Sequence, residues 1–235
     1  AVDWDQINDK LFKGLRYTPT GSGFFPPRIE LAVNPNGKKF KKDVEKAKKL
    51  LDEAGYKDTD GDGLRENKDG SKLSINFAAR TRDDANESLI QQYLLWWKEV
   101  GLNVQLLTGR TLDFPTYAEK LQKYADDFDM WTGGFTIGYN PAPDGLYGPK
   151  AAFNFGHFVE PKHTALLQRI SSNETFDEKV KKQLFLEWQQ YVQENPFAIP
   201  RFNTFELTAV NKRVKYYDTS IATKDSKAQL YQLEV

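Results

Sequence analysis

The chain has 235 residues, 39% of them hydrophobic and 14% aromatic, which is enough to build one large domain or two small ones around a substantial core. Its 33 basic and 33 acidic residues cancel, so it lacks the positive field of a nucleic-acid binder, and we exclude that class of partner. The absence of cysteine excludes disulfides, thiol nucleophiles and thiolate zinc sites. No apolar run reaches about 18 residues, so the sequence predicts no transmembrane segment.

The N-terminal part predicts two helices separated by an irregular crossing. The first spans 3–12, where apolar residues recur at helical spacing and Asp3 is the expected N-cap. A glycine- and proline-rich stretch at 18–27 has no periodicity. Asp43 then opens a second helix, and Gly55 ends it.

The middle of the chain alternates between strand and helix patterns. Strands are predicted at 73–79, 102–108 and 128–133, and helices at 84–100 and 113–124. The second of these helices carries Phe114, Tyr117, Leu121 and Tyr124 on one side. A strand, a helix and a second strand form a crossover unit, so the first two strands should be parallel neighbours. The sequence therefore predicts an α/β fold with helices packed on the sheet.

Two further helices and a possible edge strand follow. A helix is expected at 162–172, and Thr175 with Glu178 forms a predicted capping box for the next one. That helix should end at Asn195, before a proline. The stretch 197–210 is rich in strand-forming residues but contains a proline, which is typical of an edge strand.

A long loop at 132–158 stands out from the rest of the chain. No charge occurs from Met130 to Pro143, and the loop is rich in glycine and aromatic residues. Glycines after a strand allow a ligand to approach the backbone closely, and open α/β sheets bind ligands at the carboxyl ends of their strands. We interpret the loop as a binding site, with a loop packed over the core by its own rings as the alternative.

The sharpest local motif is an acidic loop at 58–69. Its spacing matches a calcium-binding loop, because hard oxygen ligands must converge around a sharp turn. The expected ligands are Asp58, Asp60, Asp62, Leu64 through its carbonyl, Glu66 and Asp69. The alternative is an acidic turn closed by its own side-chain to backbone hydrogen bonds.

Nothing in the sequence assembles into a catalytic site. The two histidines, His157 and His163, have no metal-binding spacing and are expected on the surface or in packing. The carboxylates of Asp126, Asp127 and Asp129 read as solvated rather than as a glycosidase pair. We therefore predict that the protein is not an enzyme and needs no cofactor beyond a possible structural calcium.

Several blocks, taken in order, resemble the oligopeptide-binding solute receptors of peptide-importing ABC transporters. They are 43–56 followed by 58–66, 97–104, 128–130, the loop from Gly134 to Pro141, and Asn154 ahead of the helix at 162–172. The crossing at 18–27 also fits this family. Together these blocks cover nearly the whole chain.

This resemblance implies one lobe of a periplasmic-binding-protein-like (type II) clamp, with a mixed sheet and packed helices. Residues 1–202 would form the C-terminal ligand-binding lobe, and 203–235 would return toward the hinge and the other lobe. The family implies an extracytoplasmic receptor, lipid-anchored in Gram-positive bacteria, with an oligopeptide ligand and ABC importer permease subunits as partners. The chain would then be a fragment, because the amino-terminal half is absent.

The resemblance also places the ligand at the central loop. The implied ligand-binding residues are Thr132, Gly133, Gly134, Phe135, Thr136, Gly138, Tyr139 and Asn154. Many peptide receptors carry an aspartate that grips the free amine of the ligand, and here Gly138 stands in that position. We therefore expect recognition through the peptide backbone. A receptor for a sugar or a metal chelate remains an alternative, and a carbohydrate-active enzyme is a more distant one.

Overall fold

The structure is a computed structural model of the 235-residue chain. It describes residues 1–17, 24–26, 29–30, 34, 41–123, 126–138, 141–204 and 209–215. Ala1–Asn203 form one compact unit and Thr204–Val235 a second. The first unit ends one residue beyond the predicted lobe, and the role of 203–235 at a hinge stays a prediction.

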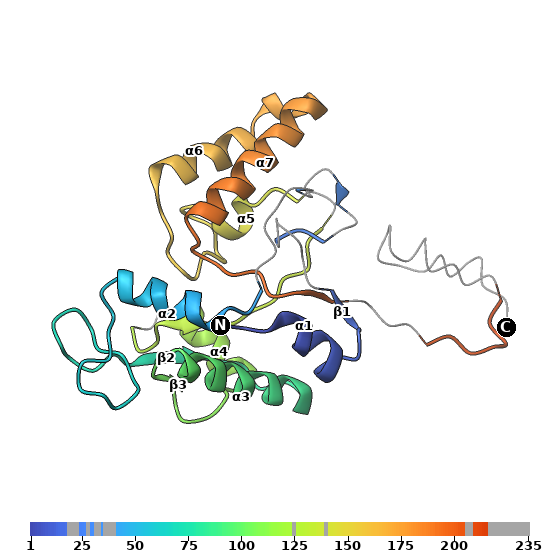
Figure 1. Ribbon diagram of the computed structural model, residues 1–235. Coiled ribbons are helices and arrows are strands. Elements are labelled where there is room, and N and C mark those ends of the chain that lie inside the picture. The colour runs from blue at the N-terminus through green and yellow to red at the C-terminus, as the bar shows by residue number, and fades with distance from the viewer. Residues whose placement is uncertain are drawn as a thin grey trace. The chain divides into compact units, whose positions relative to one another are not determined.

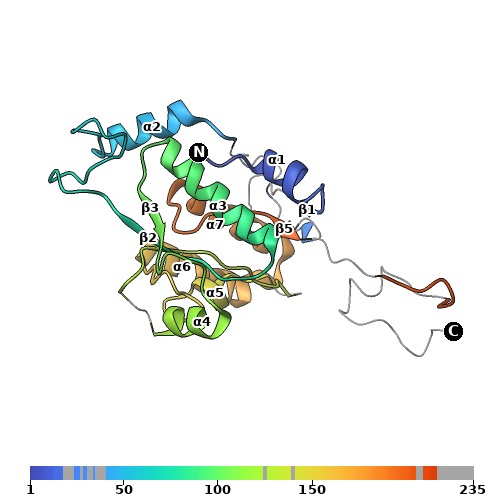
Figure 2. The same ribbon diagram turned by 90° about the horizontal axis from the view of Figure 1, so that it is seen from below.

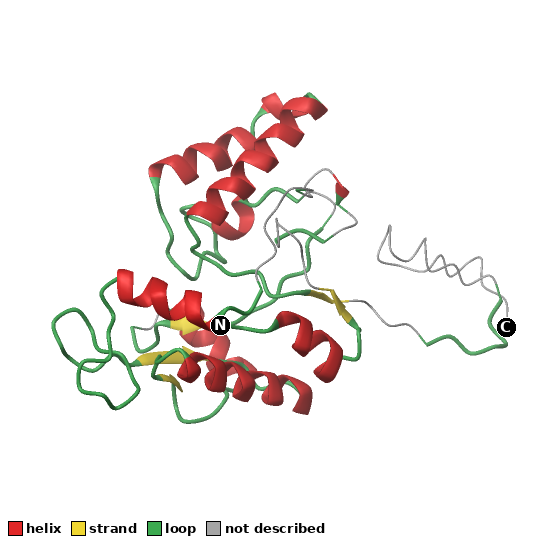
Figure 3. Cartoon of the chain, viewed as in Figure 1, coloured by secondary structure: helices red, strands yellow, loops and turns green. Residues whose placement is uncertain are grey.

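A three-stranded parallel sheet forms the centre of the α/β part. β2 (Ile75–Ala78) lies between β3 (Val104–Leu106) and β4 (Met130–Trp131), and it runs parallel to both. α3 (Asp84–Glu99) connects β2 to β3, and α4 (Phe114–Gln122) connects β3 to β4 (Figure 1; Figure 3). The predicted parallel crossover is confirmed, although each strand is shorter than its predicted range.

The alternation of side chains along β2 explains how the two helices share the sheet. Phe77 packs into a core with residues of α3, whereas its neighbour Ala78 packs with Tyr117 and Leu121 of α4. Successive residues of a strand point to opposite faces. α3 and α4 therefore cover opposite faces of the sheet, as the turned view shows (Figure 2).

α3 begins and ends within one residue of its predicted bounds. Asp83 caps α3 by accepting a hydrogen bond from the backbone of Asn86 at 2.8 Å, one residue before the predicted start. Gly101 ends α3 in the left-handed conformation at φ +86°.

The predicted inner face of α4 is only partly correct. Tyr117 and Leu121 are buried, but Phe114 is 54% exposed and packs under the guanidinium of Arg80, whose Cζ lies 4.2 Å from the ring centroid. Phe114 is the first residue of α4, so it lies at the rim of the core. Tyr124, also predicted on this face, lies outside the described residues.

The N-terminal helices form as predicted. α1 (Trp4–Gln6) begins at its cap, Asp3, and continues as the π-helix η1 (Ile7–Leu11). α2 (Val44–Glu53) begins after Asp43 and contains no fully buried residue. Of the crossing predicted at 18–27, the structure describes only 24–26.

A second helical layer carries its own core. α6 (Pro161–Ile170) and α7 (Glu178–Glu194) pack together around Trp188 and Phe185, both fully buried. The predicted capping box is wrong: Asp177 caps α7, while Thr175 lies in the 3₁₀-helix η3 (Asn173–Phe176). The short η3 turn ends there because Asp177 offers its carboxylate to two backbone N–H groups of α7.

Two shorter features complete the fold. β5 (Asn203–Thr204) pairs with β1 (Arg16–Tyr17), so only part of the predicted strand at 197–210 forms, and 205–208 lie outside the described residues. One helical turn, α5 (Asp144–Tyr147), interrupts the loop that we predicted as structureless. Among the described residues, none of the helices combines the length and the hydropathy of a membrane span.

Candidate functional site

The candidate site begins at the carboxyl end of β4. Residues 132–138 follow this strand and adopt no helix or strand. Gly133, Gly134, Phe135, Thr136 and Gly138 are all exposed. The sheet therefore delivers the predicted glycines to the edge where open α/β sheets bind ligands.

The backbone of three residues in this segment, Gly134, Phe135 and Thr136, is available for hydrogen bonding. Gly134, Phe135 and Thr136 form no backbone hydrogen bond with another described residue. Exposed backbone N–H and C=O groups of this kind are the groups with which an added peptide strand pairs.

Two side chains hold the start of the segment in place. The hydroxyl of Tyr117 on α4 donates to the carbonyl of Thr132, and burial raises the pKa of Tyr117, so it remains a protonated donor. Nη2 of Arg201 donates to the carbonyl of Gly133 at 3.1 Å. The position of the loop thus depends on residues far from it in sequence.

Gly133 also has a steric role. A Cβ at this position would lie 2.5 Å from Cζ3 of the Trp131 indole, which is far inside van der Waals contact. At Gly134 a Cβ would meet nothing within 4 Å. The first glycine is therefore required by packing, and the second leaves space beside the backbone.

A row of aromatic rings borders the segment. Trp131 contacts Phe155 with ring centroids 5.5 Å apart, Phe155 contacts Phe153 at 6.0 Å, and Phe153 contacts Phe135 at 5.8 Å. Phe153 is 50% exposed and Phe135 is 39% exposed. The exposed rings offer an apolar wall for side chains of a bound molecule.

The remaining predicted ligand-binding residues divide into two groups. Gly138 is exposed at the end of the described segment, and Tyr139 lies outside the described residues. Asn154 is buried, and its Nδ2 donates to the carbonyls of Gly148 at 3.2 Å and Phe158 at 3.1 Å. Its amide therefore braces the loop, and its contact with a ligand stays a prediction.

The acidic loop brings part of the predicted calcium ligands together. Three carboxylate oxygens, one each from Asp58, Asp60 and Glu66, lie within 4.8 Å of one another. Asp69 instead accepts hydrogen bonds from Ser71, through the backbone N–H at 3.0 Å and the hydroxyl at 2.7 Å. Leu64 donates its N–H to Asp62 at 2.8 Å. The calcium site stays a prediction.

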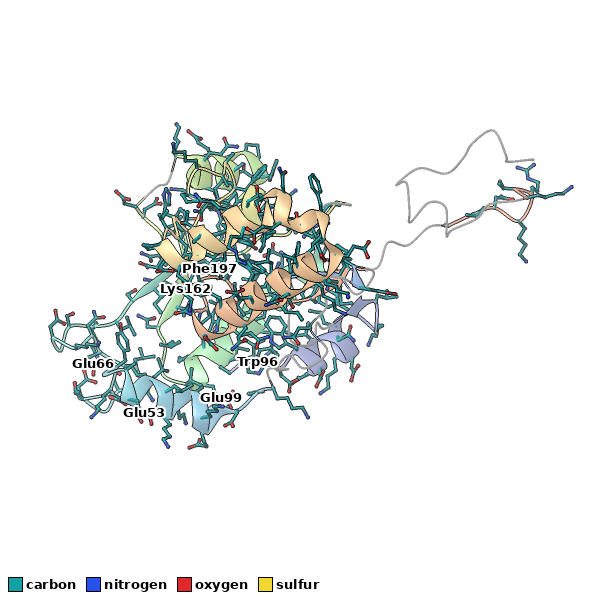
Figure 4. The ribbon with its side chains drawn as sticks, turned by 90° about the horizontal axis from the view of Figure 1, so that it is seen from above. Glu53, Glu66, Trp96, Glu99, Lys162 and Phe197 are labelled. Atoms are coloured by element: carbon teal, nitrogen blue, oxygen red, sulfur yellow. The ribbon has the colours of Figure 1, made fainter. Side chains whose placement is uncertain are left out.

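The loop also contains the hydrogen bonds of the alternative interpretation. Asp58 accepts from the backbone N–H groups of Gly61 at 2.7 Å and Gly63 at 2.9 Å. The backbone N–H and hydroxyl of Thr59 donate to Glu66 and lower the pKa of that carboxyl. Glu66, labelled in Figure 4, is buried although the loop around it is exposed.

A lysine that sequence reasoning did not include lies among these carboxylates. Nζ of Lys72 is 2.5 Å from Asp60, 2.6 Å from Asp62 and 3.3 Å from Glu66. Hydrogen bonds to Asp60 and Asp62 raise the pKa of Lys72. The ammonium thus provides positive charge at the oxygens that a calcium ion would use.

Arg201 and Tyr117 were also missed as loop anchors. Arg201 is the one charged residue in the otherwise apolar stretch 197–202. A single charge in such a stretch indicates a specific polar contact, and this was the only sequence signal for its role. Tyr117 was assigned to the core by its helical spacing, which gives no indication that its hydroxyl reaches the loop.

Comparison with known proteins agrees with this geometry. Residues 1–156 match the bacterial extracellular solute-binding proteins, family 5 Middle. The chain is 34% identical over 211 residues to the oligopeptide-binding protein OppA of Lactococcus lactis subsp. lactis (strain IL1403), covering 88% of this chain and 35% of OppA. It is 30% identical over 149 residues to AppA, an oligopeptide-binding protein of Bacillus subtilis (strain 168).

Solved structures show the same fold. Lactococcal OppA, complexed with an endogenous peptide in the closed conformation, superposes with a TM-score of 0.84 at 30% identity, covering 91% of this chain and 40% of that one. AppA from Bacillus subtilis in complex with a nonapeptide gives a TM-score of 0.69 at 19% identity, covering 92% of this chain and 42% of that one. The fold is thus that of type II periplasmic-binding-protein-like receptors, of which this chain spans little more than a third. The chain belongs to family 5 of the bacterial extracellular solute-binding proteins.

Proposed function

We propose that this chain is the C-terminal ligand-binding lobe of a receptor that captures oligopeptides outside the cell and delivers them to an ABC importer. The observation that supports this most directly is the exposed backbone of Gly134, Phe135 and Thr136, which forms no backbone hydrogen bond with another described residue. An extended peptide pairs its own backbone with such groups irrespective of its sequence.

The aromatic row complements the backbone. Phe135 and Phe153 are exposed beside Gly134 and Thr136, so ligand side chains of varied type would pack against them. The receptor would have no catalytic role, since its relatives are solute-binding proteins. Permease subunits of the importer and a lipid anchor in the intact protein belong to the same proposal.

Receptors for other solutes share the fold. The solved relatives include a protein from Thermotoga maritima bound to mannohexaose and NikZ from Campylobacter jejuni in complex with Ni(L-His), at 22% and 23% identity. These likenesses show the fold alone. The exposed backbone groups of Gly134, Phe135 and Thr136 favour a peptide over a sugar or a metal chelate, because a peptide backbone offers the complementary N–H and C=O groups.

The manner of binding follows from the missing aspartate. Gly138 is exposed, and no charged residue occurs from Met130 to Pro143. A buried ammonium would lack a partner there, which is strongly unfavourable. We therefore propose that the peptide is held by its backbone with weak dependence on a free amino terminus.

Calorimetry on the intact receptor with matched free and N-acetylated peptides tests this proposal. We expect both to bind, with affinities within about tenfold of each other. A hundredfold loss on acetylation, about 2.7 kcal/mol, would show that the amine is gripped after all. Failure of every peptide to bind would overturn the peptide function itself.

A further inference from the structure

The segment 197–203, which we call the strap, joins two separate cores of the first unit. It leads from the end of α7 to β5 (Figure 1). At one end, Phe197 packs against the core of α6 and α7. At the other end, Phe202 packs against the core that contains α3, with its ring centroid 5.5 Å from that of Phe12. The strap therefore connects the helical layer to the sheet.

The loop at 132–158 connects the same two layers in the opposite direction along the chain. It leaves the sheet after Trp131, which packs against the core that contains α4. Further along, Tyr147 and Phe158 pack against the core of α6 and α7. Two segments that are far apart in sequence thus run between the sheet and the helical layer.

The strap and the loop contact each other at both layers. At the helical layer, the rings of Phe197 and Phe158 stack with their centroids 4.4 Å apart and an interplanar angle of 13°. At the sheet, Nη2 of Arg201 donates to the carbonyl of Gly133 at 3.1 Å. The exposed residues 134–136 follow this second contact directly, so the hydrogen bond from Arg201 fixes where the candidate peptide-binding backbone begins.

Side chains hold the strap in place. Residues 197–201 form no backbone hydrogen bond with another described residue. Pro200 restricts the backbone within the strap but offers no N–H of its own. A segment that is held by few contacts opens locally at a low cost in free energy, so its local stability is sensitive to the loss of a single contact.

We propose that the strap is the positioning element of the peptide-binding segment and that Arg201 is its positioning residue. This inference rests on the proposed function. By holding the carbonyl of Gly133, Arg201 orders the backbone of 134–136 before a peptide pairs with it, which lowers the entropy lost on binding. Coupling between two segments acts in both directions, so a bound peptide stabilises the strap in return.

Tyr117 provides a matched comparison for Arg201. Its hydroxyl donates to the carbonyl of Thr132, next to Gly133, but it lies on α4 and not on the strap. Tyr117→Phe therefore loosens the start of the same segment without removing the contact between the loop and the strap. Only Arg201 should link peptide binding to the stability of the strap.

Limited proteolysis of the intact receptor by chymotrypsin measures this link. Chymotrypsin cleaves after aromatic residues, and Phe197 and Phe202 are half-buried, so cleavage there requires local opening of the strap. Cleavage sites are mapped by mass spectrometry with and without a saturating oligopeptide that contains no aromatic residue or leucine. Phe176, which is 85% exposed on η3, is the internal reference. Calorimetry gives the affinity of each variant, and thermal unfolding shows that it is folded.

In the unmodified receptor, we expect the peptide to slow cleavage after Phe197 and Phe202 by about tenfold and to leave cleavage after Phe176 unchanged. Arg201→Gln should weaken peptide binding by about tenfold and, at saturating peptide, abolish the slowing. Arg201→Lys keeps a donor and should restore part of both effects. Tyr117→Phe should keep the slowing even where its affinity for the peptide is reduced.

Other outcomes overturn the inference without touching the proposed function. If the peptide slows cleavage of the strap equally in Arg201→Gln, the bound receptor shields the strap by another route. If the peptide binds the unmodified receptor without slowing this cleavage, the two segments are not coupled. If Tyr117→Phe loses the slowing as Arg201→Gln does, any loosening of the loop suffices and the strap has no special role. Absence of peptide binding to the unmodified receptor in calorimetry overturns the proposed function, and this inference with it.

Discussion

Two adjacent glycines, Gly133 and Gly134, differ in what they contribute. A Cβ at the first would collide with the Trp131 ring, and a Cβ at the second would meet open space. Neither position requires a positive φ, because neither is among the glycines with left-handed backbone. Substituting each glycine by alanine therefore separates their roles. Gly133 is needed for packing against Trp131, and Gly134 leaves space beside the backbone where a ligand would lie.

Gly133→Ala should destabilise the lobe by about 1–3 kcal/mol, because the new methyl group overpacks the indole. Gly134→Ala should change stability by less than about 0.5 kcal/mol but weaken peptide binding, because the methyl group occupies the ligand's approach. Denaturant unfolding and calorimetry on the same two variants check this. Unchanged affinity in a folded Gly134→Ala receptor would contradict close backbone pairing at this position.

His163 confirms the packing role predicted for one of the two histidines. It is fully buried, its Nε2 accepts a hydrogen bond from Nε1 of Trp188 at 3.1 Å, and its ring lies 5.0 Å from that of Phe197. Lys162 and Phe197 mark this region in Figure 4. Protonation of Nε2 would break the bond to Trp188, so the fold requires the neutral ring.

This arrangement predicts a pH dependence of stability. Burial lowers the pKa of His163 below its ordinary value of 6.5, with Glu160 opposing. The unfolded chain then takes up a proton first as the pH falls, so the free energy of unfolding should decrease below about pH 6.5 until the folded-state pKa is reached. His163→Gln should show a smaller decrease between about pH 7.5 and 5, measured by urea unfolding. His157→Gln is the control and should retain the full decrease, since His157 is exposed.

Among the elements, α7 shows how a predicted N-cap can be misplaced by two residues. Thr175 and Glu178 have capping-box spacing, but the hydroxyl of Thr175 donates to the carbonyl of Ser172 at 2.8 Å within η3. Asp177 caps α7 instead, accepting from Lys179 at 2.8 Å and Val180 at 3.2 Å. Thr175 and Asp177 are both residue types that cap helices, and the capping-box spacing selected the wrong one.

Asp177→Ala should therefore destabilise the lobe by about 1 kcal/mol, the usual cost of losing an N-cap. Thr175→Ala should cost less, because its hydroxyl bonds within the 3₁₀ turn rather than to α7. The measurement is the free energy of unfolding of both variants. A larger loss for Thr175→Ala would restore the capping box inferred from the sequence.

In the acidic loop, Lys72 contacts carboxylate oxygens that a calcium ion would also bind. Lys72 reaches Asp60, Asp62 and Glu66, and a cation bound by Asp58, Asp60 and Glu66 would compete for the same oxygens. The hydrogen bonds that close the turn are present in either case. Replacing Lys72 with an uncharged residue therefore distinguishes a calcium site from a turn whose carboxylates are held by ion pairs with Lys72.

In chelator-treated protein, millimolar calcium should raise the melting temperature, and the rise should be larger in Lys72→Met. Asp60→Asn should abolish the rise, while Asp69→Asn should leave it intact because Asp69 bonds to Ser71. Thermal unfolding with and without calcium provides the measurement. If calcium changes the melting temperature of neither the unmodified protein nor Lys72→Met, the loop is a turn only.

At the scale of the whole molecule, the chain spans only part of the length of the relatives that it matches. It spans 35% of OppA from Lactococcus lactis subsp. lactis (strain IL1403), and a solved structure of lactococcal OppA holds an endogenous peptide in the closed conformation. Within the described segment 132–138, the exposed residues are Gly133, Gly134, Phe135, Thr136 and Gly138. We therefore attribute only part of the ligand contacts to it.

The isolated chain should fold cooperatively but bind peptides at least about a hundredfold more weakly than the intact receptor, because the other lobe supplies the remaining contacts and excludes water. Calorimetry of both proteins with one peptide tests this, with circular dichroism as the control for folding. Full affinity from residues 1–235 alone would contradict the clamp.

The sequence by itself determined the elements and their order. Periodicity located α3, α4, α6 and α7 within a few residues, and the crossover rule predicted that β2 and β3 pair in parallel. It also placed Gly133 and Gly134 at the end of a strand. These features depend on local spacing and on the chirality of the chain, both of which are readable along one segment.

Tertiary structure alone decided which side chains converge. Arg201 reaches Gly133 across 68 residues, Tyr117 reaches Thr132 from another helix, and Lys72 turns back to Asp60. Phe114 kept its helical spacing yet lies at the rim of the core under Arg80. Such contacts depend on where separate segments meet in space, and spacing within a segment carries no information about distance between segments.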